Sequence, residues 1–313
     1  MKTKPKNKFF DEKRISKKFW KRKVGEEKFF QELFFKEKLS QRKSSQDKFL
    51  SFITYGAAIM SVSILIFLVA YVVIKGLPNL KLSLFALNYT SENVSVVPAL
   101  ITTLEMTLLS LIIAVPLGVF TAVYLVEYAS RKNKIVGIIR LTTETLSGIP
   151  SIVYGLFGML FFVTYLNWGF SLIAGAFTLS IMILPLIMRT SEEALKSVPD
   201  SFREGSFGLG AGRLRTVFKI VLPSAVHGIL SGIILAIGRI VGETAALIYT
   251  SGTVAQIPSS LSDSARTLSV HMYNLSSESL HTNESYATAL ILLIMVIGIN
   301  SLASFAAKKV THL

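Results

Sequence analysis

Residues 145–188 read TLSGIPSIVYGLFGMLFFVTYLNWGFSLIAGAFTLSIMILPLIM, a run of 44 residues without a charged side chain. A helix rises 1.5 Å per residue, so about 20 apolar residues cross the hydrocarbon core of a bilayer. The run is therefore too long for one crossing. Its polar turn, Asn167-Trp168-Gly169, divides it into two predicted spans, Gly148–Leu166 and Phe170–Met188.

Four further apolar runs meet the same length criterion, at Phe52–Ile74, Pro98–Val126, Pro223–Tyr249 and Tyr286–Ala307. The sequence thus predicts an all-α polytopic membrane protein with six transmembrane helices. Only 17% of the residues are charged, whereas a soluble domain carries about a quarter. The first run begins too far into the chain, and is too long, to be a signal peptide, so we expect it to be retained. The spans form one domain, residues 51–313, preceded by a tail over residues 1–50.

The basic residues predict the orientation of the spans. With an inside N-terminus, the inner segments hold 29 of the 33 Lys and Arg residues and the outer segments hold three. Cytoplasmic loops of membrane proteins carry this excess, so both termini are expected in the cytoplasm. The predicted inner segments are 1–50, 127–147, 189–222 and 308–313.

The tail over residues 1–50 supplies most of the net charge of +14, with 17 basic and seven acidic residues. A basic tail before an apolar span is more typical of a topological anchor than of a nucleic-acid arm, and we expect no nucleic-acid partner. Phe29, Phe30, Leu33 and Phe34 share one helical face, which is compatible with an amphipathic helix on membrane lipid. A charged tail without structure is the alternative.

Several kinds of chemistry have no residues to carry them. The chain has no cysteine, and its four histidines lack the spacing of metal ligands, so we expect neither metal nor cofactor. No Gly-Lys-Ser/Thr occurs, so the chain has no phosphate-binding P-loop of its own. The outer stretch 250–285 is rich in Ser, Thr and Asn and is expected to be a loop with one short helix.

The inner segment between the fourth and fifth spans reads SEEALKSVPDSFREGSFGLGAGRLRTVFKIVLP over residues 191–223. Pro199 is expected to stop the preceding helix, and Ser201 and Glu204 have the spacing of a capping box. Gly210 suits the left-handed position after a helix. Pro223 fits the first turn of the fifth span. These signals predict a helix–turn–helix hairpin outside the bilayer.

The same segment resembles the EAA loop of ABC importer permeases, whose pattern is EAA, three residues, G, nine residues, I-x-L-P. Here the landmarks are Glu204, Gly205, Ser206, Gly210, Ile220, Leu222 and Pro223. The resemblance implies the architecture of a type I ABC importer permease, with the hairpin seated in a groove of a separate ATPase. The chain itself would then be a non-catalytic transmembrane subunit, because hydrolysis comes from a partner.

Other segments resemble phosphate (Pst-type) permeases, and the A-type subunit, PstA, in particular. These segments are Glu144–Gly158, Ser197–Glu204, Gly238–Ala246, Thr267–Tyr273 and Tyr286–Leu290. The resemblance implies a multi-pass protein of the bacterial plasma (inner) membrane that imports inorganic phosphate. Its implied partners are a second permease subunit (PstC type), an ATP-binding subunit dimer (PstB type) and an extracytoplasmic phosphate-binding protein (PstS type).

Span five carries two charged residues, Arg239 and Glu243. A charge inside a bilayer is unfavourable, so such residues usually face the bundle interior and serve a function. Their spacing of four places them on one helical face, where they can pair. We place Arg239, Glu243 and the adjacent Thr244 on the substrate pathway, where Arg239 would bind phosphate oxygens and Glu243 would repel sulfate, which lacks a P–OH donor. An ion pair that only neutralises itself is the alternative.

Three other functions were weighed. Within the same class, the cargo could be another oxyanion, such as sulfate, molybdate or phosphonate. From a different class, an ion-driven secondary transporter should show internal repeats or discontinuous helices at mid-membrane, and neither is clear in the sequence. An intramembrane enzyme would need a nucleophile with its base or a metal set, and the sequence shows no such constellation.

Overall fold

The structure is a computed structural model that describes residues 45–130, 133–277 and 281–311. Within these ranges every regular element is a helix, which confirms the predicted all-α fold. Five helices are long and apolar enough to cross a membrane, and a sixth span is present if one sharply bent pair counts as one crossing. Six expected spans therefore agree with the fold, although several helix ends differ from the predicted ones.

The chain divides into two compact units, residues 1–69 and 70–313, and each is described by itself. In the first unit the described residues begin at Ser45, where α2 (Ser45–Gly76) begins. The predicted amphipathic helix of the tail lies outside the described residues. α2 contains the predicted first span, and its side chains are exposed from residue 47 to residue 69, as lipid contact would require.

The second unit begins with the last turns of α2, which pack on the start of α12 (Thr282–Thr311). The hydroxyl groups of Tyr71 and Tyr286 lie 3.2 Å apart. A Cβ on Gly76 would lie 2.7 Å from the carbonyl oxygen of Tyr286, so only glycine allows this approach. Two short 3-10 helices follow, η1 (Leu77–Asn79) and η2 (Leu82–Phe85).

Two long helices contain the second and fourth predicted spans. α3 (Val97–Val123) continues without a break into a π-helical turn, η3 (Tyr124–Tyr128). α6 (Leu172–Lys196) extends eight residues beyond the predicted end of its span, because Arg189–Lys196 stays helical up to Pro199.

The third span is not one straight helix. α4 (Lys134–Ser147) is followed by α5 (Ser151–Gly158) and its π-helical continuation η4 (Met159–Tyr165), and the two parts meet at 102°. The break falls at Pro150, whose ring prevents helical continuation across residues 148–150. The Tyr154 hydroxyl donates to the Leu146 carbonyl at 2.8 Å and so satisfies a backbone group at the bend.

The predicted turn between the third and fourth spans is confirmed. Asn167 and Gly169 adopt positive φ angles of 55° and 65°. Trp168 between them stacks on Phe162 with ring centroids 5.2 Å apart and meets Phe177 edge-on. The polar turn thus reverses the chain while its aromatic side chain packs against both neighbouring helices.

The fifth span differs from its predicted limits of Pro223–Tyr249. The helix is continuous from Arg213 to Val241 through α8 (Arg213–Thr216), the π-helical η5 (Val217–Val221) and α9 (Leu222–Val241). Pro223 therefore lies inside the helix and not at its start. The wider π turn before it accommodates a residue that cannot donate a backbone hydrogen bond.

α6 is the central helix of the second unit, packed between α3 and α9. Its buried side chains include Leu179, Met182, Ile183 and Ile187, none more than 1% exposed. Small residues bring the helices together: a Cβ on Gly118 of α3 would lie 2.8 Å from Ile187 of α6.

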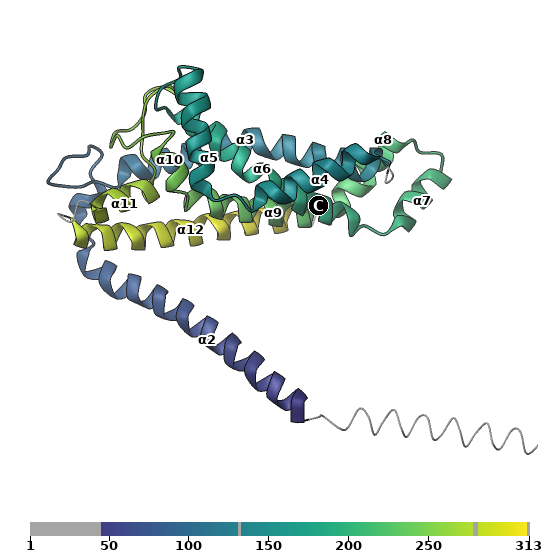
Figure 1. The fold of residues 1–313 in the computed structure, drawn as a ribbon, viewed down its shortest axis with the longest axis horizontal. Coiled ribbons are helices and arrows are strands. Elements are labelled where there is room, and N and C mark those ends of the chain that lie inside the picture. The colour runs from purple at the N-terminus through teal and green to yellow at the C-terminus, as the bar shows by residue number, and fades with distance from the viewer. Residues whose placement is uncertain (1–44, 131–132, 278–280, 312–313) are drawn as a thin grey trace, which may run out of the picture. The chain divides into compact units, whose positions relative to one another are not determined.

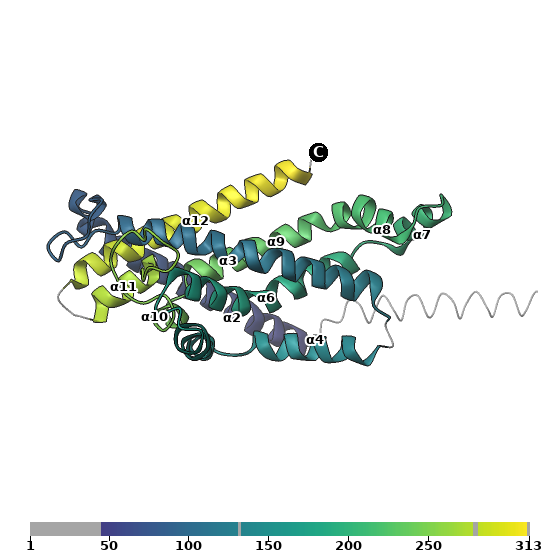
Figure 2. The same ribbon diagram turned by 90° about the horizontal axis from the view of Figure 1, so that it is seen from above.

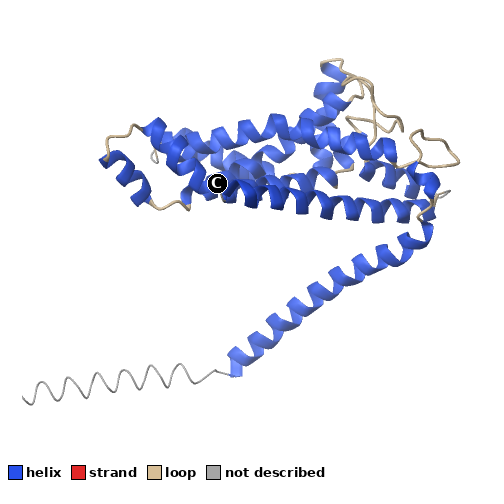
Figure 3. Ribbon diagram, turned by 180° about the vertical axis from the view of Figure 1, so that it is seen from behind, coloured by secondary structure: helices blue, strands red, loops and turns tan. Residues whose placement is uncertain are grey.

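The short elements gather at the two ends of the second unit, as Figures 1 and 2 show. α7 (Asp200–Gly208) and α8 lie at one end. α10 (Ala245–Ile248) and α11 (Leu268–Ser277) lie at the other, which confirms the short helix expected within residues 250–285. Figure 3 shows long loops gathered around this second end.

A prediction follows from the contact between α5 and α10. Gly155→Ala would place a Cβ 2.7 Å from the Cα of Ala246, a backbone atom that cannot move aside. We expect a loss of about 1–3 kcal/mol from overpacking and a lower melting temperature in detergent by scanning fluorimetry. Gly137→Ala in α4 is the control, since no atom lies within 4 Å of its new Cβ and alanine favours the helix. Equal melting temperatures for the two variants would contradict the packing argument.

Candidate functional site

The hairpin at one end of the second unit is built around α7. Pro199, with φ −58° and ψ 140°, precedes the helix and makes no side-chain cap. The predicted capping box of Ser201 and Glu204 is wrong, because Asp200 already begins the helix and both residues lie within it. The backbone conformation of Pro199 therefore determines where α7 begins, because no side chain caps the helix.

The end of α7 is as predicted. Gly210 has φ +81°, the left-handed conformation that glycine adopts without strain. The Gly210 amide donates to Phe207 at 2.9 Å, and the Ala211 amide donates to Ser206 at 3.1 Å. These two bonds form a Schellman motif, which closes α7 and turns the chain back toward α8.

The EAA-like residues divide between the two faces of α7. Glu204 and Gly205 are exposed, and the nearest other atom is more than 4 Å from a Cβ at Gly205. Ser206 is buried, and its hydroxyl lies 2.8 Å from the hydroxyl of Thr216 in α8. One face of α7 therefore packs on α8 through this hydrogen bond, and the opposite face, called the open face below, is exposed to solvent.

The open face is apolar in part. Phe202 is 52% exposed, and Leu209 is 91% exposed. Glycines separate these side chains, so the surface between them is shallow. Such a surface suits contact with another protein, because apolar side chains at its centre would be removed from water.

Arg203 fastens α7 to two long helices, and the sequence did not predict this role. Its guanidinium forms an ion pair with Glu127 of η3, with an N–O distance of 2.7 Å. It also donates to the carbonyls of Val198 and Leu195 at the end of α6, at 2.7 and 2.9 Å. The hydrogen bond to Glu127 is the main cause that raises the pKa of Arg203. Arg203 thus joins α3, α6 and α7.

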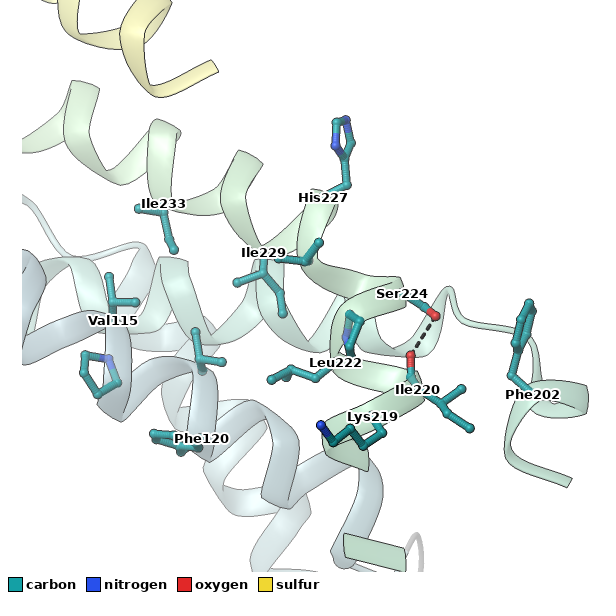
Figure 4. Close-up of a pocket in the computed structure, with 14 residues that line it drawn as sticks. Val115, Phe120, Phe202, Lys219, Ile220, Leu222, Ser224, His227, Ile229 and Ile233 are labelled. Carbon is teal, nitrogen blue, oxygen red and sulfur yellow. Dashed lines mark hydrogen bonds between the residues drawn. The ribbon is translucent and has the colours of Figure 1, made fainter. Parts of the chain in front are cut away.

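The remaining landmarks, Ile220, Leu222 and Pro223, line a groove of about 1070 Å³ between α3 and the helix formed by η5 and α9. Figure 4 shows Val115 and Phe120 on the α3 side. The Ser224 hydroxyl donates to the Ile220 carbonyl at 2.7 Å within this helix. These three residues therefore line the groove at the end of the fifth span that is nearest α7.

Arg239 lines a second cavity of about 590 Å³, together with Ser231 and Gly238 of α9, Leu186 of α6 and Asn300 of α12. The side-chain oxygen of Asn300 is buried and has no hydrogen-bond partner among the described residues. Asn300 lies 18 residues into α12, about 27 Å along its axis, so the cavity is deep within the predicted membrane region. A half-buried guanidinium and an amide thus face one cavity.

Asn300 was not predicted from the sequence as a site residue. The signal was an amide side chain in a span that has no charged residue. Such a residue needs a hydrogen-bonding partner inside a bilayer, and here it faces the cavity of Arg239.

The expected pairing of Arg239 with Glu243 is wrong. α9 ends at Val241, so the one-turn spacing of a continuous helix does not apply, and the two side chains form no ion pair. Glu243 is only 8% exposed, and its carboxylate accepts the Ala246 amide of α10 at 3.1 Å. Thr244 follows in the break, and its hydroxyl lies 3.5 Å from the Gly242 carbonyl.

The break at residues 242–244 interrupts the fifth span between α9 and α10. The Ser269 hydroxyl of α11 donates to the Glu243 carbonyl at 2.5 Å. Side chains thus satisfy backbone groups that would otherwise be unpaired in a bilayer. A discontinuous helix, which the sequence did not show clearly, is therefore present.

Comparisons with known proteins identify the family of this chain. The family described as "Binding-protein-dependent transport system inner membrane component" matches residues 114–311. The probable ABC transporter permease protein YqgI of Bacillus subtilis (strain 168) is 35% identical over 237 residues, 71% of this chain and 80% of the relative. The phosphate transport system permease protein PstA of Mycobacterium leprae (strain TN) is 37% identical over 210 residues, 64% of this chain and 67% of the relative.

A solved structure shows the same fold. In a bacterial ABC transporter involved in the import of the acidic polysaccharide alginate, one chain is similar with a TM-score of 0.58 and 15% identity. The match covers 84% of this chain and 98% of that chain. The chain therefore belongs to the binding-protein-dependent transport system inner membrane components, and it is an ABC importer permease.

Proposed function

We propose that this chain is the permease subunit of an ATP-driven importer of inorganic phosphate and forms half of its translocation pathway. The observation that carries the proposal is Arg239, a half-buried guanidinium that shares a deep cavity with the amide of Asn300. Guanidinium and amide groups donate hydrogen bonds to oxyanions. Relatives named as phosphate permeases support phosphate as the cargo.

ABC permeases work with an ATPase, a substrate-binding protein and a second permease. For this chain we propose a PstB-type ATPase dimer, a PstS-type phosphate-binding protein and a PstC-type permease. The family is one of multi-pass inner-membrane components. The distribution of basic residues supports cytoplasmic termini, which would place α7 on the ATPase side and α11 on the side of the binding protein.

We further propose that α7 is the element that contacts the ATPase. The open face with Glu204 and Gly205 lies at the end of the molecule predicted to be cytoplasmic. Leu209 is almost fully exposed and Phe202 is half exposed, so two large apolar side chains of this end remain open to a partner. Contact with a groove of the ATPase would bury them.

Leu209→Glu tests this contact. A carboxylate in place of an apolar side chain would be desolvated in the interface, so the ATPase should no longer co-purify with the permease. Leu82→Glu is the matched control: Leu82 is 92% exposed, close to the 91% of Leu209, and lies before α3 at the other end. Both variants should fold. Normal recovery of the ATPase with Leu209→Glu would rule out contact at this face.

Arg203 would transmit movement of α7 to the spans, as a positioning residue that touches neither ATP nor cargo. Lysine keeps the positive charge but cannot reproduce the paired bonds of a guanidinium. In Arg203→Lys the ATPase should still assemble and hydrolyse ATP, while phosphate transported per ATP falls several-fold in proteoliposomes.

Arg189→Lys is the control for Arg203→Lys. Arg189 pairs with Glu193 at 3.2 Å, but both side chains are more than half exposed. An exposed pair contributes about 0–1 kcal/mol, whereas breaking a buried one costs about 3–5 kcal/mol. Equal coupling ratios in both variants would show that Arg203 has no special role.

The pathway proposal predicts different results for Arg239 and Glu243. Arg239→Ala should abolish phosphate uptake, and full uptake would overturn the proposed pathway. Glu243→Gln keeps an oxygen that can accept the Ala246 amide, so uptake should continue, whereas Glu243→Ala should lose it together with the cap of α10.

Inhibition by sulfate in Glu243→Gln then separates two roles of this side chain. New inhibition would assign the rejection of sulfate to the carboxylate charge. Unchanged rejection would limit Glu243 to its structural bond and leave cargo selection to other groups. Competition by molybdate and phosphonate in the unmodified importer tests the identity of the cargo itself.

A further inference from the structure

The end of the second unit opposite α7 contains a buried arginine that has no acidic partner among the described residues. Arg266 lies just before α11, is 7% exposed, and donates its backbone amide to Val254 at 3.0 Å. Its side-chain Nε and Nη2 atoms are buried and have no hydrogen-bond partner in the part of the chain that the structure describes. No carboxylate of those residues lies within ion-pair distance of it.

The unpartnered Nε and Nη2 atoms of Arg266 correspond to the two atoms by which Arg203 binds a carboxylate. Nε and Nη2 of a guanidinium point the same way and bind two oxygens of one acid group. In Arg203 these two nitrogens bind the carboxylate of Glu127 at 3.1 and 2.7 Å. In Arg266 the equivalent donors have no oxygen to bind within the part of the chain that the structure describes. A buried charge without a partner is strongly unfavourable, so this edge calls for an anion.

The nearest carboxylate in sequence is engaged elsewhere. Asp263 accepts hydrogen bonds from Ser259, through both its hydroxyl and its amide, and from the Ser260 amide. The hydroxyl bond from Ser259 is the main cause that lowers the pKa of Asp263. Asp263 therefore stabilises its own turn, and the described residues supply no counter-charge to the guanidinium of Arg266.

Two aromatic side chains complete the surroundings of Arg266. His271 of α11 is fully buried, and neither ring nitrogen has a partner of normal geometry among the described residues. The half-buried ring of Tyr89 lies over the guanidinium, 4.6 Å from its central carbon, and meets the His271 ring edge-on at 6.0 Å. Tyr89 covers the face of the guanidinium, and the Nε–Nη2 edge lies buried without a hydrogen-bond partner among the described residues.

His271 is neutral at physiological pH. Burial, followed by the positive charge of Arg266, lowers its pKa to about 3, and the nearby Val94 backbone offsets this only in part. A neutral imidazole has one N–H donor and one lone pair that accepts. It can therefore accept a hydrogen bond from a protonated oxygen while Arg266 binds the charged ones.

We propose that Arg266 and His271, beneath Tyr89, form a second binding site for an inorganic oxyanion of the phosphate type. Two oxygens would lie on the Nε–Nη2 edge of Arg266, and a P–OH group would donate to His271. Sulfate has no such proton near neutral pH and would bind more weakly. This inference rests on the proposed function, and it places a receiving site at the end opposite α7, before the cavity of Arg239.

The test uses the assembled transporter without its binding protein, in nanodiscs, with radiolabelled phosphate in equilibrium dialysis. An Arg239→Ala background removes the contribution of the deeper cavity. In that background phosphate should still bind, and adding Arg266→Gln should weaken binding at least tenfold. Arg266→Lys should lose part of the affinity, because it keeps the charge but not the paired donors.

Two further variants separate this site from general electrostatics and from misfolding. Lys81→Gln removes a positive charge near the same end, where Lys81 pairs with Glu284, and should leave phosphate binding unchanged. His271→Leu keeps an apolar ring-sized volume but loses the acceptor, so the preference for phosphate over sulfate should disappear.

The inference is overturned if Arg239→Ala complexes bind phosphate equally well with and without Arg266→Gln, or if His271→Leu keeps full preference for phosphate. It is also overturned if Arg266→Gln weakens only docking of the binding protein, since the site would then contact a protein. Phosphate uptake by the unmodified importer stands as a separate result, so the proposed function survives any of these outcomes.

Discussion

The need to satisfy every backbone polar group inside a bilayer explains most of this structure. Helices do so by themselves, and at two places where the spans leave helical geometry a side chain binds a backbone group. At the bend after α4, the Tyr154 hydroxyl binds the Leu146 carbonyl. At the break after α9, Glu243 binds an amide and Ser269 binds a carbonyl. These polar residues of the spans therefore have a structural role, because they form hydrogen bonds with backbone groups.

That constraint also separates Arg239 from its neighbour Glu243. The carboxylate is used by the backbone, so the positive charge of Arg239 is not neutralised within the same helix. Arg239 instead lines a cavity to which α12 contributes Asn300. Under the proposed function, this positive charge inside the predicted membrane region would attract the anion that crosses the membrane.

Composition and spacing predicted much of the fold. Uncharged runs identified the spans, and Asn167-Trp168-Gly169 and Gly210 were located correctly because turn chemistry is local. The capping box, the start of the fifth helix and the Arg239–Glu243 pair were predicted wrongly. Each depended on where a helix begins or ends, and that was decided by Pro199, by η5 and by contacts of α10 with other helices. Local pattern cannot report such contacts.

The candidate sites follow the same division. The EAA-like spacing located α7 from sequence alone, whereas Arg203, Asn300 and Arg266 gained significance only from their surroundings. The sequence does not distinguish the two arginines. The guanidinium of Arg203 binds a carboxylate, whereas the Nε–Nη2 edge of Arg266 has no partner among the described residues. Partner distances and burial were needed to tell them apart.

The two π-helical turns beside α7 have a mechanical consequence. η3 carries Glu127, the partner of Arg203, and η5 follows α8, so the routes from α7 into α3 and into α9 each pass through a wider and less regular turn. Such a turn bends and twists more readily than α-helix. A displacement of α7 would then rotate α3 and α9 as rigid helices, and most of the bending would occur at η3 and η5. α9 runs from Leu222 to Val241 and is about 30 Å long. Because Arg239 lies near its far end, rotation about η5 would displace Arg239 and its cavity further than the end of α9 that adjoins η5.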